Sequence, residues 1–479
     1  MLESLTLKPE PAQWPTSPLV RARSLFGRDL SDWVATTRSE LFGSTPEFVI
    51  ATGHQAEVWH PGILAKYLAL DAFAEASRAD LRVELIVDQD PGDPLQLRAP
   101  LFESSVGSRL VRETIYLHDA PAEHERLCTG TRRPVTARPP DAATRGRLSL
   151  DEVRAGCLAI VEAFNDAQNE STLALQAARA TLQLRQRLGL SESRKSPRSF
   201  LTASQLTRTT LWHELLERLM TDPLEAARSY NRAVESSPGA GVALLDIRGD
   251  EIELPLWRVP PDRPRERFTT AHFDDLRNGS ISREEIWPRG LLMTGFMRLV
   301  VADLMIHGLG GETYDRITEQ WMRDWIGVEL APFVVVSATL LLDFDYDPAT
   351  EADLAQATWW AHHLPHNLDR FLNEPEAREE KRRLLHAIEE APRGSQERAA
   401  HFQALTSLRR ELQARHRSTT QHAVEIRREI QRGFDERTIL SDRTWPFAFY
   451  KERSLHELAT AIRGRFTTPP ARDSFAVTG

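Results

Sequence analysis

The sequence predicts an α/β protein whose core is a parallel sheet, and three observations point to this class. The stretch from Phe48 to Val87 reads as a buried strand, an amphipathic helix and a second strand in close succession. Such a βαβ unit makes its two strands parallel. The run Pro332 to Leu342 is apolar and rich in β-branched residues, which is typical of a central strand. Long helical patterns separate and follow these strands.

Composition limits the classes of protein that fit. The 479 residues, 41% hydrophobic and 27% charged, predict a globular protein with more than one structural unit. A net charge of −9 argues against general nucleic-acid binding, which needs a basic face. Cys128 and Cys157 are the only cysteines, too few for a disulfide framework or a thiolate zinc site. Because neither a signal peptide nor an apolar run of about 20 residues is present, we expect a cytoplasmic protein without a membrane partner.

The first candidate loop follows the strand at Phe48. It reads Thr52-Gly53-His54-Gln55, and a helix is predicted from Pro61 to about Ser77. The first turn of a helix has unpaired N–H groups and a partial positive charge, so this loop is suited to an anion. Glycine lets the backbone approach a ligand, and His54 and Gln55 add polar groups at the carboxyl end of the strand. The alternative is an ordinary strand–helix turn in which His54 packs or caps.

A second loop, Asp88-Gln89-Asp90, follows the strand Leu81 to Val87. Because carboxyl ends of neighbouring parallel strands lie at one edge of a sheet, we expect Asp88 and Asp90 to lie beside His54 and Gln55. The two loops together form one candidate site.

The middle of the chain is mostly helical. Residues 148–235 carry helical spacing and are predicted to form an inserted helical subdomain, in which Trp212 and His213 are expected to pack between helices. Val242 to Ile247 returns to strand character. A helix is predicted from Leu291 to Ile306, and a second from Tyr314 to Trp325. The loop between these helices contains Gly308, Gly310, Gly311 and Glu312, which suit a ligand cradle or, alternatively, close packing of helices.

Two polar groups invite a metal interpretation. Asp343, Asp345 and Asp347 alternate after the last strand, but they lack the rest of a calcium loop and are better explained as a solvated strand end. The group at His362, His363 and His366 has helical spacing without the glutamate of a zinc protease motif, so aromatic and histidine packing is favoured. We therefore predict no metal site.

The stretch Leu368 to Glu436 is heavily charged, with apolar residues in steps of three and four, as in a coiled coil. A break at Ala391 to Ser395 predicts two antiparallel helices, which we expect to pair two subunits in a homodimer. The aromatic stretch at Thr444 to Phe449 predicts that the C-terminal segment packs on the core. The predicted segments are an N-terminal part of the core (1–147), the helical insert (148–235), a second part of the core (236–347), the arm (348–436) and the C-terminal segment (437–479).

The order of these parts resembles the bacillithiol-biosynthesis cysteine-adding enzyme (BshC) family. That family has a TGQQ loop, matched by Thr52 to Gln55, and an acidic motif matched by Asp88 to Asp90. Gly308, Gly311 and Glu312 fall on its later Gly-rich loop. Pro446 and the following Lys-Glu-Arg echo its C-terminal motif. The resemblance implies a Rossmann-like core, related to nucleotidyltransferases, with helical inserts and an antiparallel coiled-coil arm used for dimerisation.

The resemblance also implies an activity. It is ligation of cysteine, or a similar amino acid, to the amine of a sugar–malate acceptor, with ATP or ADP and magnesium as expected cofactors. His54 would stabilise a phosphate or oxyanion, Gln55 would orient the ligand, and Asp88 or Asp90 would hold the ammonium or a magnesium ion. The remaining candidate ligand-binding residues are Thr52, Gly53, Gly308, Gly310, Gly311 and Glu312.

Two departures from the family pattern leave alternatives open. The family has Gly-Pro and a lysine in the helix after the first loop, whereas here the helix begins His60-Pro61-Gly62 and Lys66 does not fall on the lysine position. Met293 stands where the family has an arginine, so that a bidentate partner for a carboxylate or phosphate is missing. One alternative is a non-catalytic dimer that binds a nucleotide or another metabolite. The other is a coiled-coil interaction scaffold.

Overall fold

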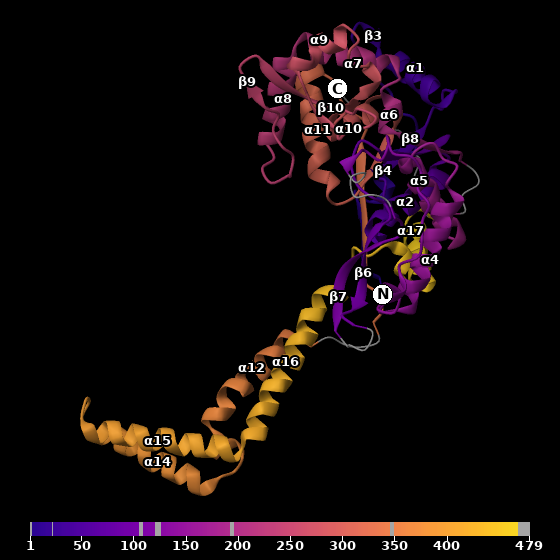
Figure 1. Ribbon diagram of the computed structural model, residues 1–479. Coiled ribbons are helices and arrows are strands. Elements are labelled where there is room, and N and C mark those ends of the chain that lie inside the picture. Colours follow the sequence, from indigo (N-terminus) through magenta and orange to yellow (C-terminus); the bar gives the residue numbers. More distant parts are fainter. Residues whose placement is uncertain are drawn as a thin grey trace. The chain divides into compact units, whose positions relative to one another are not determined.

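The computed structural model describes residues 2–21, 23–104, 109–119, 126–191, 196–344 and 349–467. The chain folds into two compact units (Figure 1). The first contains Met1–Leu101, Arg112–Asp343 and Arg443–Gly479. The second contains Phe102–Val111 and Phe344–Asp442. None of the helices formed by the described residues has the length and apolar character needed to cross a membrane.

The first unit is built on a six-stranded sheet, which confirms the predicted α/β class. In spatial order its strands are β1 (Leu2–Lys8), β14 (Phe333–Leu340), β13 (Leu304–His307), β4 (Val49–Gln55), β5 (Leu81–Val87) and β8 (Arg198–Thr202). The edge strand β1 is antiparallel to β14, and the other neighbours are parallel. Numbered along the chain, the parallel strands have the spatial order 3-2-1-4-5, with the order reversing between β4 and β13.

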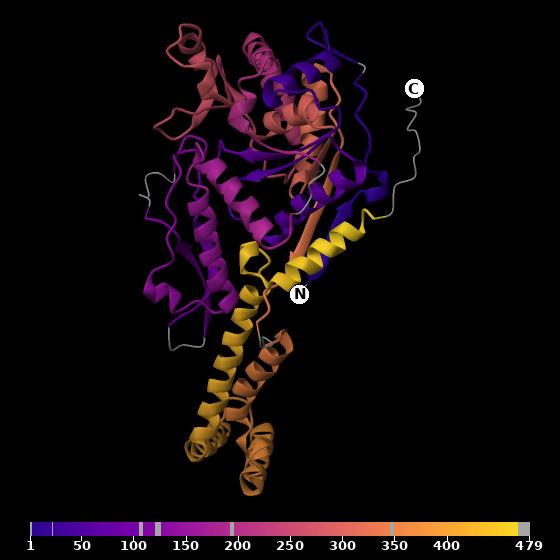
Figure 2. The ribbon, with the colours of Figure 1, turned by 90° about the vertical axis from the view of Figure 1, so that its right-hand side faces the viewer.

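Helices cover both faces of this sheet (Figure 2). On one face α2 (Pro61–Ser77) packs against β4 and β14, and α5 (Leu173–Arg187) packs against β5 and β8. On the other face Val49 and Ala51 of β4 enter a large core that contains Trp212 and Trp321. Since β4 is buried on both faces, its sequence is apolar without alternation until the polar residues at its carboxyl end.

One predicted helix, Leu291 to Ile306, was wrong in its second half. The helix α10 (Gly290–Phe296) continues as a π-helical turn over Met297–Val301, and the chain then enters β13. Asp303 separates the two, because its carboxylate accepts the N–H of Val49 at 2.9 Å and pairs with Arg38 at 2.8 Å. These buried contacts hold the start of β13 beside β4.

Three other expectations differ from the structure. Of the predicted strand Val242 to Ile247, only β9 (Ile247–Arg248) forms, paired with β10 (Glu251–Arg258). The first strand of the chain, β1, was not predicted, because it lies on a sheet edge where three of its seven residues are exposed and none is buried. The 148–235 stretch is helical as expected, but it also contributes β8 to the main sheet.

The remaining strands and helices of the chain are β2 (Ser24–Leu25), β3 (Arg28–Asp29), α1 (Leu30–Phe42), β6 (Gln96–Phe102), β7 (Leu110–Tyr116), α3 (Ala142–Arg145), α4 (Asp151–Asp166), α6 (Ala203–Leu206), α7 (Thr210–Thr221), α8 (Pro223–Glu235), β11 (Glu266–Thr269), α9 (Phe273–Arg277), β12 (Ile286–Pro288), α11 (Gly311–Ile326), α12 (Glu351–His363), α13 (Leu368–Phe371), α14 (Pro375–Glu390), α15 (Gln396–Arg415), α16 (Arg417–Leu440) and α17 (Glu452–Gly464).

The second unit consists mainly of paired helices. The chain breaks at Ala391 to Ser395, and α14 packs against α15 through Leu384, Ile388 and Leu405. An unpredicted second break at His416 starts α16, which packs against α12. The stretch predicted as two helices therefore forms three long ones, with α13 before them.

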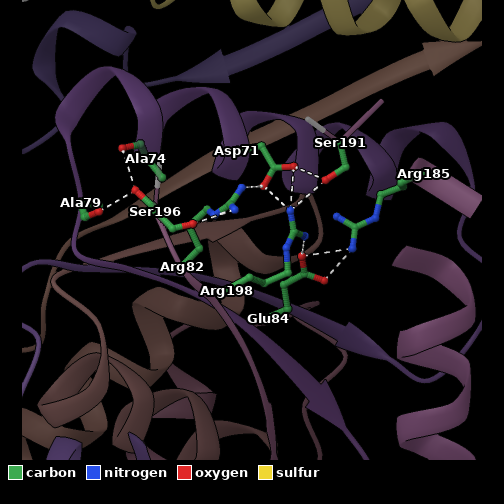
Figure 3. Close-up of polar contacts among 9 residues, drawn as sticks. All are labelled: Asp71, Ala74, Ala79, Arg82, Glu84, Arg185, Ser191, Ser196 and Arg198. Carbon is green, nitrogen blue, oxygen red and sulfur yellow. Dashed lines mark hydrogen bonds and ion pairs between the residues drawn. The ribbon is translucent and has the colours of Figure 1, made fainter. Parts of the chain in front are cut away.

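A buried ionic cluster joins the sheet to α2 and α5 (Figure 3). Arg82 and Glu84 of β5 point into the face that these helices cover. Arg82 pairs with Asp71 of α2 at 2.6 Å, and Glu84 accepts two hydrogen bonds from Arg185 of α5, at 2.7 and 3.0 Å. Arg198 of β8 contacts both carboxylates. Because buried charges need partners, this cluster fixes the positions of α2 and α5 on the sheet.

Candidate functional site

A cleft of about 740 Å³ lies at the carboxyl ends of β4, β5 and β13. This is the edge where the strand order reverses, the usual ligand site of an open parallel sheet. The three predicted loops meet here. The predicted residues that line the cleft are Gly53, His54, Gln55, Asp90, Gly308, Gly310 and Gly311.

Three predicted site residues lie elsewhere. Thr52 is buried, and its hydroxyl donates to the Ile306 carbonyl at 2.7 Å, which ties β4 to β13. Asp88 is 1% exposed and accepts the N–H of Ser204 at 3.1 Å and its hydroxyl at 2.5 Å, which caps α6. Glu312 pairs with Arg316 at 3.4 Å on the outside of α11. Burial raises the pKa of Asp88 to about 6. The two hydrogen bonds from Ser204 give this carboxyl a structural role.

Glycine at position 53 is required by the neighbouring strand. A Cβ at this position would lie 2.8 Å from the Leu85 Cβ and 2.9 Å from the Leu85 carbonyl oxygen on β5. The spacing of β4 and β5 thus depends on glycine here.

Gly53→Ala should therefore lower the free energy of unfolding by about 1–3 kcal/mol, because overpacking displaces β5. Urea unfolding followed by circular dichroism measures the effect. Gly464→Ala is the control, because a side chain there meets nothing within 4 Å. Equal stability of the two variants would contradict this role of Gly53.

The start of α2 is less open than the sequence suggested. The His60 ring accepts the N–H of Gly62 at 3.0 Å, and the carbonyl of His60 accepts the N–H groups of Ile63 and Leu64. The predicted anion site at this helix terminus is therefore closed by its own cap. His54 lies in front of it, with Nδ1 3.1 Å from a Glu57 carboxylate oxygen. Burial lowers the pKa of His54, which keeps the ring neutral.

The cation at the floor of the cleft is Lys66, which was not among the predicted site residues. It lies on α2 among buried residues, and its ammonium donates to the Gly53 carbonyl at 2.7 Å. Burial lowers the pKa of Lys66 to about 7. A signal was present in the sequence: Lys66 is the only charged residue in the apolar run from Gly62 to Leu70, and a buried charge requires a reason.

A second group of cations forms one wall. The guanidinium groups of Arg265 and Arg289 lie 4.2 and 4.7 Å from the ring centroid of Trp257. Arg265 donates to the Gln89 carbonyl at 2.6 Å and pairs with Asp90, and Arg289 pairs with a buried glutamate of β10. Asp90 is the one carboxylate among the described residues that line the cleft. With Lys66 and these arginines, the cleft carries an excess of positive charge.

The two expected cofactors, a nucleotide and magnesium, do not fit the cleft equally well. The cationic side chains suit the phosphates of a nucleotide. Magnesium prefers oxygen ligands, but Asp88 is engaged by Ser204 and Asp90 is paired with Arg265. Among the described residues no group of three or more His, Cys, Asp or Glu side chains could hold a metal ion. His362, His363 and His366 belong to these described residues, whereas Asp345 and Asp347 lie outside them.

No protein-family model matches the sequence, and no curated protein matches it.

Proposed function

We propose that this chain is an enzyme that joins an amino acid, cysteine or a similar one, to the amine of an acidic sugar conjugate, as in bacillithiol-type thiol biosynthesis. The observation that carries the proposal is the cleft at the strand-order reversal, which is lined by Lys66, by the three arginines Arg265, Arg289 and Arg443, and, among the described residues, by a single carboxylate, Asp90. An acidic conjugate and a nucleotide both carry the negative charge that this cleft favours. The resemblance to the cysteine-adding enzymes supplies the reaction.

The side chains suggest a division of roles. Lys66 has two further ammonium protons besides the one it donates to Gly53, and these suit a phosphate or an oxyanion. His54 would support this charge from the neighbouring loop. Asp90, with Gln55 3.4 Å away, is the group that suits an ammonium of the ligand. The residues fit the phosphates of ATP or ADP, and no step is assigned to magnesium.

The proposed fold type, homodimer and cellular setting follow from the same resemblance to the cysteine-adding enzymes. The strand order supports a Rossmann-like core of the nucleotidyltransferase type. The pairing of α14 with α15 and of α12 with α16 supports an antiparallel coiled-coil arm, which would join two chains in a homodimer. The proposed setting is the cytoplasm.

The direct test incubates the protein with ATP, cysteine and glucosaminyl-malate and follows the product by mass spectrometry. We expect a product that contains cysteine, and its loss in His54→Ala with an unchanged circular dichroism spectrum. His386→Ala is the control, since this histidine is exposed on α14. Undiminished turnover in His54→Ala would remove His54 from the mechanism.

A second candidate function is non-catalytic metabolite binding. It is favoured by the loss of Asp88 to a structural contact and by Met293, whose sulfur contacts the Gln89 amide at 3.4 Å. Calorimetric binding of ATP, ADP or glucosaminyl-malate, without product from the wild-type protein, would select this candidate.

A further inference from the structure

His307 lies at the carboxyl end of β13 and lines the cleft beside Lys66 and Gly308. Its Nε2 is buried and lies 3.1 Å from Oδ2 of Asp315, on α11. The angle falls short of a hydrogen bond, but neither atom has another partner among the described residues. Nε2 therefore faces the protein interior, and the cleft receives the other side of the ring.

Asp315 is itself fixed by a second buried charge. Its Oδ1 accepts a hydrogen bond from Arg298 at 3.1 Å, and both side chains are fully buried. Arg298 also donates to the Ala331 carbonyl at 2.7 Å and pairs with Glu319. Burial raises the pKa of Asp315 to about 7, and the charged guanidinium of Arg298 opposes this shift, so the carboxylate form prevails at about pH 8. A carboxylate opposite Nε2 selects the tautomer with the proton on Nε2, which leaves a lone pair on Nδ1.

Gly311 determines whether that lone pair can be reached. A Cβ at Gly311 would lie 2.9 Å from both Cβ and Nδ1 of His307, closer than side-chain carbons approach other atoms. Any other residue at this position would crowd the Nδ1 edge of the ring or displace the ring. The neighbouring Gly310 has no such constraint, because a side chain there meets nothing within 4 Å. Of these two glycines, only Gly311 lies so close to the His307 ring that a side chain would crowd it.

We propose that His307 is a proton acceptor in the cleft, that Asp315 is its positioning residue, and that Gly311 keeps Nδ1 open to an amine of the ligand. The amine rests on the proposed function. In that reaction the amine nitrogen bonds to the carbonyl carbon of an acyl phosphate, and the carbon–oxygen bond to phosphate breaks. Phosphate leaves with the bonding electrons, and the N–H proton passes to Nδ1. Burial, and after it the neighbouring charges of Lys66 and Arg298, hold the pKa of His307 well below its usual value, which leaves the ring neutral.

The first test uses no substrate, so its outcome is separate from that of the proposed ligation. Diethyl pyrocarbonate modifies unprotonated, accessible imidazole nitrogens, and peptide mass spectrometry gives the rate at each histidine. We expect His307 of the native wild-type protein to react through Nδ1 and Gly311→Ala to lose this reactivity. Gly310→Ala should retain it, and His54 serves as an internal standard in each protein.

The second test reads the tautomer. Nuclear magnetic resonance of histidine-labelled protein, with His307 assigned by its absence in His307→Gln, should show Nε2 protonated and Nδ1 bare at about pH 8. Asp315→Asn should abolish that preference, an effect that a merely structural contact would not produce. The proposal is overturned by an unreactive His307 in the wild-type protein, by equal reactivity in Gly311→Ala, or by a proton on Nδ1.

Discussion

Glu84→Gln is expected to lower the free energy of unfolding by about 3–5 kcal/mol, because it removes one charge from a buried ionic cluster. Glu84 is 2% exposed and contacts both Arg185 and Arg198. Without it, three guanidinium groups share the single carboxylate of Asp71. Glutamine retains the volume of the side chain, so the loss reports charge and not a cavity.

Urea unfolding with circular dichroism detection measures this difference. Glu162→Gln is the matched control, since Glu162 pairs with Arg187 at 3.3 Å but is largely exposed. Exposed pairs contribute about 0–1 kcal/mol. A loss in Glu84→Gln no larger than that of the control would show that the cluster does not hold α2 and α5 on the sheet.

Lys66→Met is expected to weaken sulfate binding by at least about tenfold, because a charge-assisted hydrogen bond contributes roughly 1.5–3 kcal/mol. The same substitution should raise stability, since it removes a buried charge whose pKa is lowered to about 7. Opposite effects on binding and stability are typical of a residue that serves a ligand. Isothermal titration calorimetry and thermal unfolding measure the two quantities.

The pH dependence follows from the same pKa. Sulfate stays a dianion across the neutral range, so its affinity should fall as pH rises through about 7 and Lys66 loses its proton. Lys66→Arg is the control, because an arginine that binds sulfate keeps its charge and removes the pH dependence. A rise in pH has the opposite effect on the stability of the protein. The unfolded chain holds this proton up to about pH 10, so the contribution of Lys66 to stability increases between pH 7 and pH 10. An affinity for sulfate that does not change across neutral pH would contradict this role.

The part of the fold that could be predicted is the part whose strands and helices are evident from the local sequence pattern. The βαβ unit from Val49 to Val87 shows two short apolar runs on either side of a helix that begins at Pro61, and the carboxyl-end rule then places His54 and Asp90 at one cleft. The strand β13 was missed because Leu291 to Ile306 is apolar throughout, so that periodicity cannot separate helix from strand. The sequence feature that marks the start of β13 is Asp303, the acidic residue inside this apolar run. Its contacts with Val49 and Arg38 separate the helical segment from the strand.

The cleft was predictable only in part, for a related reason. The residues that follow the strands directly were found, whereas Arg265 and Arg289 reach the cleft from β10, β11 and β12 and their connections, which are distant in sequence. Asp88 was expected beside Asp90, yet only Asp90 faces the cleft. Asp88 turns inward, to Ser204 at the start of α6. Spacing in the sequence does not reveal such long-range partners.

The central claim is that the cleft between β4 and β13 binds an anion through Lys66. Diffraction from crystals of the protein soaked in sulfate tests it most directly. We predict an ordered sulfate in the cleft with an oxygen about 2.7–3.0 Å from the Lys66 ammonium, and its absence from crystals of Lys66→Met soaked in the same way. A cleft without ordered sulfate in the wild-type protein, or the same sulfate in Lys66→Met, would contradict the claim.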